Sequence, residues 1–350
     1  MFPSVGGSRF FEPRNRQVSP RPVSLWMGLI GSSIVRLLPL APRFVVRWVA
    51  NRYVAGETLD HALSVIREID SQGACFTVDV LGEEISSLDE THFFIREYEA
   101  VLDAIADHNI DANISIKPTA FGLLVDLGAA LDNIEGIIRK ASEHDIFVRL
   151  DMEDSRVTQA TIDVLHSMHE RGLSNVGVAI QGRLHRTLDD ISTITASLGP
   201  DADLRVCKGI YLEPSDISQT DYKSIVKATN DAIDAAIEGG AYVAIASHDD
   251  PVIEHSLQSV SSAGMGPGID DPRPNAPTRG AGKGPGYEFQ FLLGVRGDVR
   301  RSLAKKGHRT RVYLPYGVRW YEYSMRRLRE NPEVAIHITK ALLLPWKNRR

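Results

Sequence analysis

The stretch RVYLPYGVRWYEYSMRRLREN, residues 311–331, determines how the rest of the chain is interpreted. Its β-branched and aromatic start favours a strand over residues 310–314 that ends before Pro315. A helix then follows over residues 319–330 and ends before Pro332, because proline disfavours helical geometry at the preceding residue. A strand that leads directly into a helix is the repeating unit of parallel α/β folds.

Two neighbouring arginines on this helix, Arg326 and Arg327, form a candidate anion site. Adjacent guanidinium groups repel each other unless an anion joins them, and a carboxylate matches their planar geometry best. A solvated basic face capped by Glu330, three and four positions further on, explains the same pair about equally well. Tyr323, one turn earlier, and Tyr313, at the end of the strand, favour the carboxylate site.

Apolar runs and amphipathic stretches alternate along the rest of the chain. The expected strands are residues 74–80, 112–117, 146–152, 176–181, 203–208, 241–247, 287–293 and 310–314. The expected helices are residues 89–108, 127–144, 158–171, 184–198, 221–238, 251–262, 298–306 and 319–330. Eight strand–helix units predict an α/β fold of the (βα)8 TIM-barrel type. A doubly wound open sheet is the alternative, but no G-x-G-x-x-G turn follows an early strand.

Composition narrows the class of protein. The chain has 350 residues, 43% of them hydrophobic and 24% charged, which suits one large globular domain. A net charge of −5 indicates no general affinity for nucleic acid. Cys75 and Cys207 are the only cysteines, which excludes a disulfide framework and fits a cytoplasmic protein. The histidines lack ligand spacing, so no metal is expected.

The sequence predicts two domains: an N-terminal helical extension over residues 1–72 and a catalytic barrel over residues 73–350. A helix over Leu59–Asp70, capped by Thr58, closes the extension. Residues 22–35 carry no charge, but they are fewer than the roughly 18–20 needed to span a bilayer. Peripheral contact with the inner face of a membrane and packing on the chain's own barrel both remain open for them.

Residues 264–286 contain seven glycines and five prolines. Such a composition predicts a long loop between the sixth helix and the seventh strand. A lid over the site and a simple spacer have the same composition. The spacer is favoured, because Met265 and Ile269 are the only sizeable apolar residues available to pack over a site.

Polar residues stand at or just after the carboxyl ends of most predicted strands. In a barrel these ends meet at one mouth, so many polar groups there predict a polar ligand. They are Asp79, Glu83, Lys117, Asp151, Gln181, Arg205, Lys208, Ser247, His248, Gln290 and Tyr313.

These motifs, in their order, resemble those of the proline dehydrogenase family over roughly residues 50–332. The matching segments are DVLGE (79–83), SIK (115–117), DME (151–153), RVCKG (205–209), ASHD (246–249), YEFQ (287–290) and Y-x-x-RR-x-x-EN (323–331). The resemblance implies oxidation of L-proline to Δ1-pyrroline-5-carboxylate by bound FAD, with electrons passed to a quinone-type acceptor.

The resemblance also implies roles for single residues. Lys117, Arg326 and Arg327 would hold the substrate carboxylate, and Tyr313 would pack against the ring. Tyr323 and Glu83 would complete the substrate site, with Glu83 paired to a helix arginine. Asp151 would organise the hydrogen-bond network, and Arg205 would place positive charge beside the hydride-accepting atom of the flavin. The implied cofactor-binding residues are Met152, Gln181, Arg205, Cys207, Lys208, Gly209, Ser247, His248 and Gln290.

Two other interpretations remain open from the sequence. An aldolase-like barrel would use Lys117 or Lys208 as a Schiff-base nucleophile, but it leaves the arginine pair and Arg205 unexplained. A membrane-associated barrel without activity would give the N-terminal segment the main role. The number of oligomeric subunits is not indicated.

Overall fold

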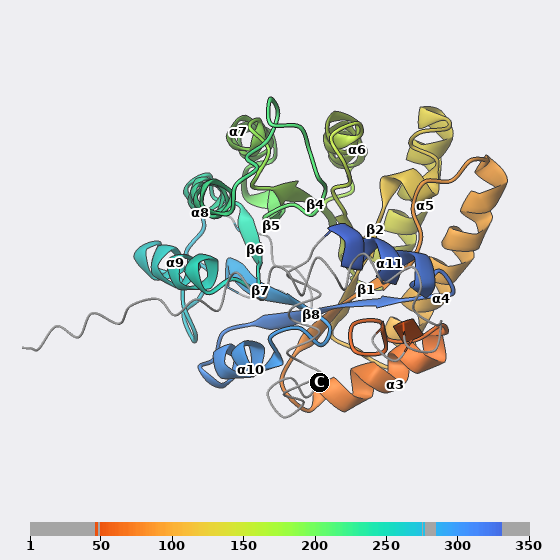
Figure 1. The fold of residues 1–350 in the computed structure, drawn as a ribbon, viewed down its shortest axis with the longest axis horizontal. Helices are drawn as coiled ribbons and strands as arrows, with labels where there is room; N and C mark the ends of the chain where they lie inside the picture. The colour runs from red at the N-terminus through yellow and green to blue at the C-terminus, as the bar shows by residue number, and fades with distance from the viewer. Residues whose placement is uncertain (1–45, 48–49, 275, 277–284, 331–350) are drawn as a thin grey trace, which may run out of the picture.

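The computed structural model describes residues 46–47, 50–274, 276 and 285–330, and for residues 326–330 it describes the helical backbone only. Eight parallel strands follow one another in chain order and close into a barrel surrounded by helices (Figure 1). This confirms the predicted (βα)8 barrel. The strands are β1 (Cys75–Val80), β2 (Ala112–Ile116), β3 (Val148–Leu150), β4 (Val176–Gln181), β5 (Asp203–Cys207), β6 (Tyr242–Ala246), β7 (Tyr287–Leu292) and β8 (Thr310–Tyr316).

The helices also follow the predicted order. They are α3 (Leu59–Asp70), α4 (Thr91–Asp107), α5 (Leu127–Glu143), α6 (Thr158–Glu170), α7 (Thr187–Leu198), α8 (Tyr222–Glu238), α9 (Asp250–Ser262), α10 (Gly297–Lys305) and α11 (Trp320–Glu330). Thr58 caps α3 as expected, because its side chain accepts a hydrogen bond from the His61 N–H. Residues 1–45, the larger part of the predicted extension, lie outside the described residues.

Several boundaries differ from the prediction, most clearly those of β3, α7 and β8. β3 has three residues instead of seven. α7 begins at Thr187 instead of residue 184, because Leu184 forms an isolated bridge with Ser218. β8 runs through Pro315 to Tyr316. Pro315 is tolerated because the pairing with β7 ends at Tyr313, so the missing N–H breaks no bond on that side.

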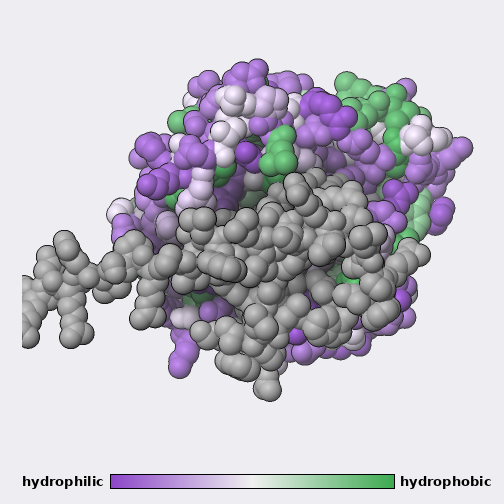
Figure 2. Space-filling model, in the orientation of Figure 1, coloured by the Kyte–Doolittle hydropathy of each residue, from purple (hydrophilic) through white to green (hydrophobic). Residues whose placement is uncertain are grey.

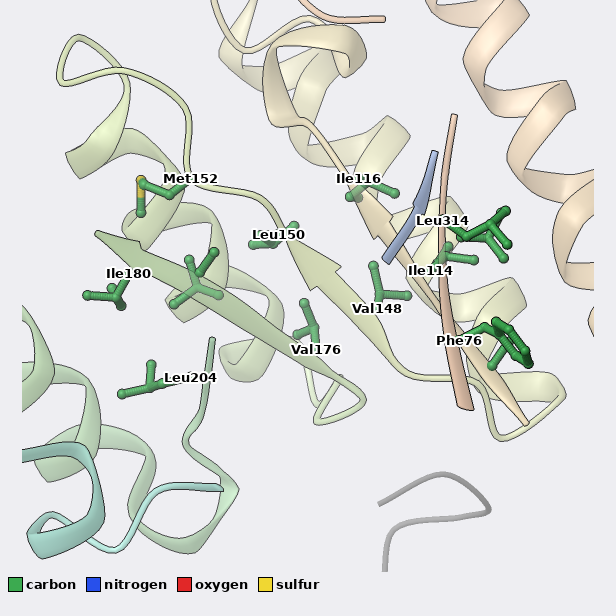
Figure 3. Packing of buried hydrophobic residues seen from close by; sticks show 14 of the residues in the cluster. Phe76, Ile114, Ile116, Val148, Leu150, Met152, Val176, Ile180, Leu204 and Leu314 are labelled. Atoms are coloured by element: carbon green, nitrogen blue, oxygen red, sulfur yellow. The ribbon is translucent and has the colours of Figure 1, made fainter. Parts of the chain in front are cut away.

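The outward faces of the strands form the apolar core. Phe76, Ile114, Val148 and Leu150 occupy alternate strand positions and are fully buried between the sheet and the helices (Figure 3). Because side chains alternate between the two faces of a strand, the residues between them point into the barrel. The strands therefore have an apolar outer face and a more polar inner face, although their sequences are largely apolar.

The barrel interior is polar and paired. Arg149 on β3 forms a fully buried ion pair with Asp203 on β5, crossing β4 at Gly177. A Cβ atom at Gly177 would lie 2.7 Å from Arg149 Nη1, so only glycine leaves room for this crossing. On the other side, Arg311 Nε lies 2.7 Å from Glu288 Oε1, again with both side chains buried. Pairing avoids the large cost of burying single charges.

The described ends of the Gly/Pro-rich segment lie at the amino end of the barrel. Arg273 Nη1 donates to Gly240 O over 3.3 Å, and its guanidinium carbon lies 5.6 Å from the Tyr242 ring centroid. The Val243 N–H donates to Gly286 O over 3.0 Å. Gly240, Tyr242 and Gly286 all precede or open a strand. This position, opposite the carboxyl ends of the strands, supports the spacer interpretation.

The visible surface is mostly hydrophilic, with hydrophobic residues in small separate patches (Figure 2). Leu124, Val125 and Leu127, at the start of α5, are each between 43% and 54% exposed. Among the described residues, no helix is both long enough and apolar enough to cross a membrane.

Candidate active site

A cavity of about 230 Å³ opens at the carboxyl ends of the strands. Most of the residues predicted for the site line it together. These are Lys117, Asp151, Met152, Gln181, Arg205, Cys207, Lys208, Gly209, His248, Gln290, Tyr313 and Tyr323. The strands thus converge as the barrel requires.

Asp151 is the centre of the polar network. Its Oδ1 accepts hydrogen bonds from the Ser115 hydroxyl at 2.5 Å and from Arg205 Nη1 at 2.6 Å. Its Oδ2 accepts from the Tyr313 hydroxyl at 2.7 Å and lies 3.5 Å from Lys117 Nζ. Burial opposes ionisation, but the cations and hydroxyl donors outweigh it and lower the pKa of Asp151. The side chain is therefore a carboxylate acceptor at neutral pH.

Lys117 lies between two carboxylates. Its ammonium donates to Asp79 Oδ1 at 2.5 Å and faces Asp151 on the other side. Burial alone would lower the pKa of Lys117, but these two carboxylates outweigh it, so the pKa is raised. Complete burial raises the pKa of Asp79 despite the bond from Lys117. A lysine held in the charged form suits anion binding and does not suit a Schiff-base nucleophile.

Arg205 lines the cavity and has one donor without a partner among the described residues. Its Nε donates to Gln290 Oε1 at 2.7 Å, and its Nη1 donates to Asp151 and Ser115. The guanidinium carbon stands 5.2 Å from the Tyr313 ring centroid. Nη2 is buried and has no hydrogen-bond partner among the described residues. A buried donor without a partner is costly, which indicates a ligand acceptor at this position.

Gln181, next to Gly209, supplies a second buried polar atom without a hydrogen-bond partner among the described residues. Gln181 Nε2 donates to Glu153 O at 2.7 Å, whereas its buried Oε1 has no partner within the described part of the chain. Gly209 has φ +97°, and a Cβ atom there would lie 2.7 Å from that same oxygen. Glycine is therefore required here, both for the positive φ and for the close approach of the backbone to the Gln181 side chain.

The remaining predicted cofactor residues differ in their hydrogen-bond partners and in whether they line the cavity. Lys208 Nζ pairs with Asp249 Oδ2 at 2.6 Å, and Cys207 Sγ lies 3.4 Å from Ile180 O. His248 Nε2 accepts from the Leu292 N–H at 3.0 Å. Ser247 is buried and is not among the cavity-lining residues, and its hydroxyl accepts from the Asp249 N–H at 3.3 Å. Direct cofactor contact by Ser247 stays a prediction.

The structure describes α11 only in part. Tyr323, on α11, is buried and lines the cavity. Arg326 and Arg327 lie in the backbone of α11, but their side chains are outside the description. Glu83 follows β1 and is half-buried, and it is not among the cavity-lining residues. The predicted roles of these three side chains therefore stay predictions.

Three residues that the sequence placed in strand-end motifs, but to which it gave no role, take part in the site. Ser115 and Asp79 point inward beside Asp151 and Lys117, and Glu153 lines the cavity wall. Ser115 stands two residues before Lys117, so period-two alternation would have assigned it to the inward face. Burial raises the pKa of Glu153 to about 7. No short motif signals such a shift, because it depends on how completely the carboxyl is enclosed.

The sequence profile of the proline dehydrogenase family matches residues 62–339. The chain belongs to the proline dehydrogenase family. Proline dehydrogenase 1 of Bacillus subtilis (strain 168) is 31% identical over 307 residues, which are 88% of this chain and 95% of that protein. The proline dehydrogenase of Deinococcus radiodurans is 31% identical over 299 residues, 84% of this chain and 90% of that protein.

A solved structure shares the barrel fold. Proline utilization A of Bdellovibrio bacteriovorus, inactivated by N-propargylglycine, superposes with a TM-score of 0.71 at 21% identity. The match covers 82% of this chain but only 33% of that protein, so this proline dehydrogenase chain spans about a third of its length. At this identity the likeness shows the fold.

Proposed function

We propose that the chain oxidises L-proline to Δ1-pyrroline-5-carboxylate with FAD and passes the electrons to a quinone-type acceptor. One observation carries the proposal: Lys117, Asp151, Arg205 and Tyr313 line a single cavity, and two polar atoms of its lining residues have no hydrogen-bond partner in the part of the chain that the structure describes. Membership of the family supports the substrate, because its named members are proline dehydrogenases.

The substrate side of the site is built for a carboxylate. Lys117 is held charged by its two aspartate neighbours, and Tyr323 brings α11 to the cavity wall. Arg326 and Arg327, on the same helix, would supply the planar forks that a carboxylate matches. Fixing the carboxylate orients the ring, so that the hydrogen on the carbon next to nitrogen faces the hydride acceptor.

The charges around Lys117 support a role for those arginines. Lys117, Asp79, Asp151 and Arg205 are linked by ion pairs, and the formal charges of these four groups cancel. A substrate carboxylate adds one negative charge to this buried network, and an uncompensated buried charge is expensive. Additional cations are therefore needed when substrate binds, and α11 provides two adjacent ones.

The residues present fit a flavin. Arg205 Nη2 offers a donor and Gln181 Oε1 an acceptor, both buried and both left unsatisfied by the described residues. Gly209 lets the backbone pass close to Gln181 without a Cβ clash. Lys208, His248 and Gln290 would complete the polar wall that holds the cofactor. When bound, FAD supplies the hydride acceptor, and Arg205 places positive charge where negative charge accumulates on reduction.

The residues would divide the remaining work. Asp151 would hold Arg205 and the Tyr313 hydroxyl in fixed positions, and the Tyr313 ring would limit the size of the substrate ring. We further propose a division into an extension, residues 1–72, and a catalytic barrel, residues 73–350. The proposal also includes a cytoplasmic location with peripheral contact at the inner face of the membrane, where a quinone-type acceptor would be reached.

Absorbance of the purified protein tests the proposal. A flavoprotein is yellow, and L-proline added without oxygen should bleach its oxidised flavin spectrum. A colourless active enzyme would favour the aldolase alternative. A yellow protein that proline leaves unchanged would rule out proline as the substrate.

A further inference from the structure

Segment 50–56 lies at the mouth of the barrel. The Ala55 N–H donates to Pro315 O at 2.8 Å, and the Gly317 N–H donates to Gly56 O at 3.0 Å. Pro315 is near the carboxyl end of β8, and Gly317 is in the turn that leads into α11. The segment is thus joined by backbone hydrogen bonds to the end of β8 and to the turn that leads into α11.

A glycine on the opposite side seats this segment. Gly294 follows β7 with φ +71°, and a Cβ atom there would lie 1.9 Å from Arg52 O. No side chain fits in that space, and the neighbouring atom is backbone that cannot rotate away. Ala50, Tyr53 and Val54 are buried to 5% exposure or less, which fixes the segment against the barrel.

The same region contacts the first residue of α11. The Arg47 guanidinium carbon stands 5.5 Å from the Trp320 ring centroid, and Arg47 Nη2 pairs with Glu57 Oε1 at 2.8 Å. Three residues after Trp320, Tyr323 forms part of the cavity wall. A shift at the start of α11 would therefore move the wall, because a helix transmits displacement along its axis as a rigid element.

We propose that segment 50–56, seated on Gly294 and bonded to the turn at Gly317, is a positioning element that holds α11 against the cavity. It sets the affinity for the carboxylate substrate without contacting either substrate or cofactor. The part concerning substrate rests on the proposed function. The part concerning α11 stands on the contacts above.

A matched pair of glycine variants of the full chain tests this. Gly294→Ala places a methyl group against Arg52 O, whereas Gly264→Ala has nearly the same φ, +72°, and nothing within 4 Å of the added Cβ. Both variants carry the same backbone strain, so their difference isolates the displaced segment. Amide hydrogen exchange across α11, bound flavin and the KM for L-proline are measured for each.

Gly294→Ala is expected to speed exchange in α11 and raise the KM by about tenfold, while flavin content matches Gly264→Ala. Equal exchange and equal KM in the two variants would overturn the proposal. Loss of flavin together with the KM change would show a general collapse of the mouth, and would overturn it as well.

A second pair keeps the test decisive if Gly294→Ala does not fold. Arg47→Gln removes both the contact over Trp320 and the ion pair, whereas Glu57→Gln removes the ion pair alone. Faster α11 exchange in Arg47→Gln only is the expected result, and identical behaviour of the two variants contradicts it. Hydrogen exchange needs no turnover, so failure of wild-type protein to oxidise proline would refute the proposed function separately.

Discussion

The Tyr313 hydroxyl donates a 2.7 Å hydrogen bond to Asp151 Oδ2, which ties the last strand of the barrel to the loop after the third. The sequence indicated only that Tyr313 packs against a substrate ring. The structure adds that its hydroxyl is one of the donors that keep a buried carboxylate ionised. The Tyr313 ring is thus available to pack against a substrate, while its hydroxyl stabilises the charge of Asp151.

Tyr313→Phe should therefore have a measurable effect. Removing one donor from a buried carboxylate costs about 1–3 kcal/mol, and the lost packing in Tyr313→Ala adds to that. We expect kcat to fall in both variants and the KM to rise further in Tyr313→Ala. Wild-type kcat and KM in Tyr313→Phe would show that the hydroxyl contributes nothing beyond packing.

Asp151→Asn should impair turnover more than cofactor retention. An amide cannot balance the charges of Lys117 and Arg205, so the network around the substrate loses its negative centre. We expect kcat to fall by roughly a hundredfold, as when one group of a preorganised polar site is removed. Asp249→Asn, which disturbs only the Lys208 pair at the cavity rim, is the control. Equal losses in the two variants would contradict a special role for Asp151.

Arg326→Met and Arg327→Met should weaken proline binding while flavin remains bound. A charge-assisted hydrogen bond is worth about 1.5–3 kcal/mol, which corresponds to one to two decades in affinity. Arg329→Met, which removes one positive charge from the same helix, measures the nonspecific effect of charge. Loss of flavin in step with proline affinity would mean that α11 has a structural role instead.

The raised pKa of Glu153 should make the free energy of unfolding depend on pH. Burial raises this pKa from 4.5 to about 7, so between these values the folded state binds more protons than the unfolded state. The free energy of unfolding should then decrease as the pH rises from 4.5 to 7, by about 3 kcal/mol from this group, and change little above that. Denaturant unfolding of wild type and Glu153→Gln at several pH values checks this, since the variant should lack this part of the slope.

The Gly/Pro-rich segment should tolerate shortening. Its described ends contact the amino end of the barrel, far from the carboxyl ends that form the cavity. Replacing residues 267–278 with a few glycines should leave proline oxidation nearly intact. A large loss of kcat with flavin still bound would show that the segment reaches the mouth after all.

Much of the barrel followed from the sequence because the helices and strands alternate in strict order. Strand ends were found within about two residues for most strands, and polar residues at those ends predicted the cavity. β8 was predicted two residues too short, because Pro315 normally ends a strand and only the early end of β7 makes it harmless. That information lies in the register between strands, which one strand's sequence does not contain.

Other features depended on distances through space. Arg205 Nη2 and Gln181 Oε1 have no hydrogen-bond partner among the described residues, and this depends on where all the neighbouring side chains lie. Likewise, the contact of Arg52 with Gly294 joins residues 242 positions apart in the chain. Residue type and spacing carry no sign of such an approach.

The crossing of Arg149 over Gly177 to Asp203 also constrains how the barrel can change over generations. Any side chain at Gly177 strikes the arginine, and loss of either charge strands the other in the interior. A single substitution at Arg149, Gly177 or Asp203 should therefore destabilise the barrel, so we expect these three residues to be inherited together. Among distant relatives, we expect either the whole trio or none of it, with an apolar barrel floor in its place.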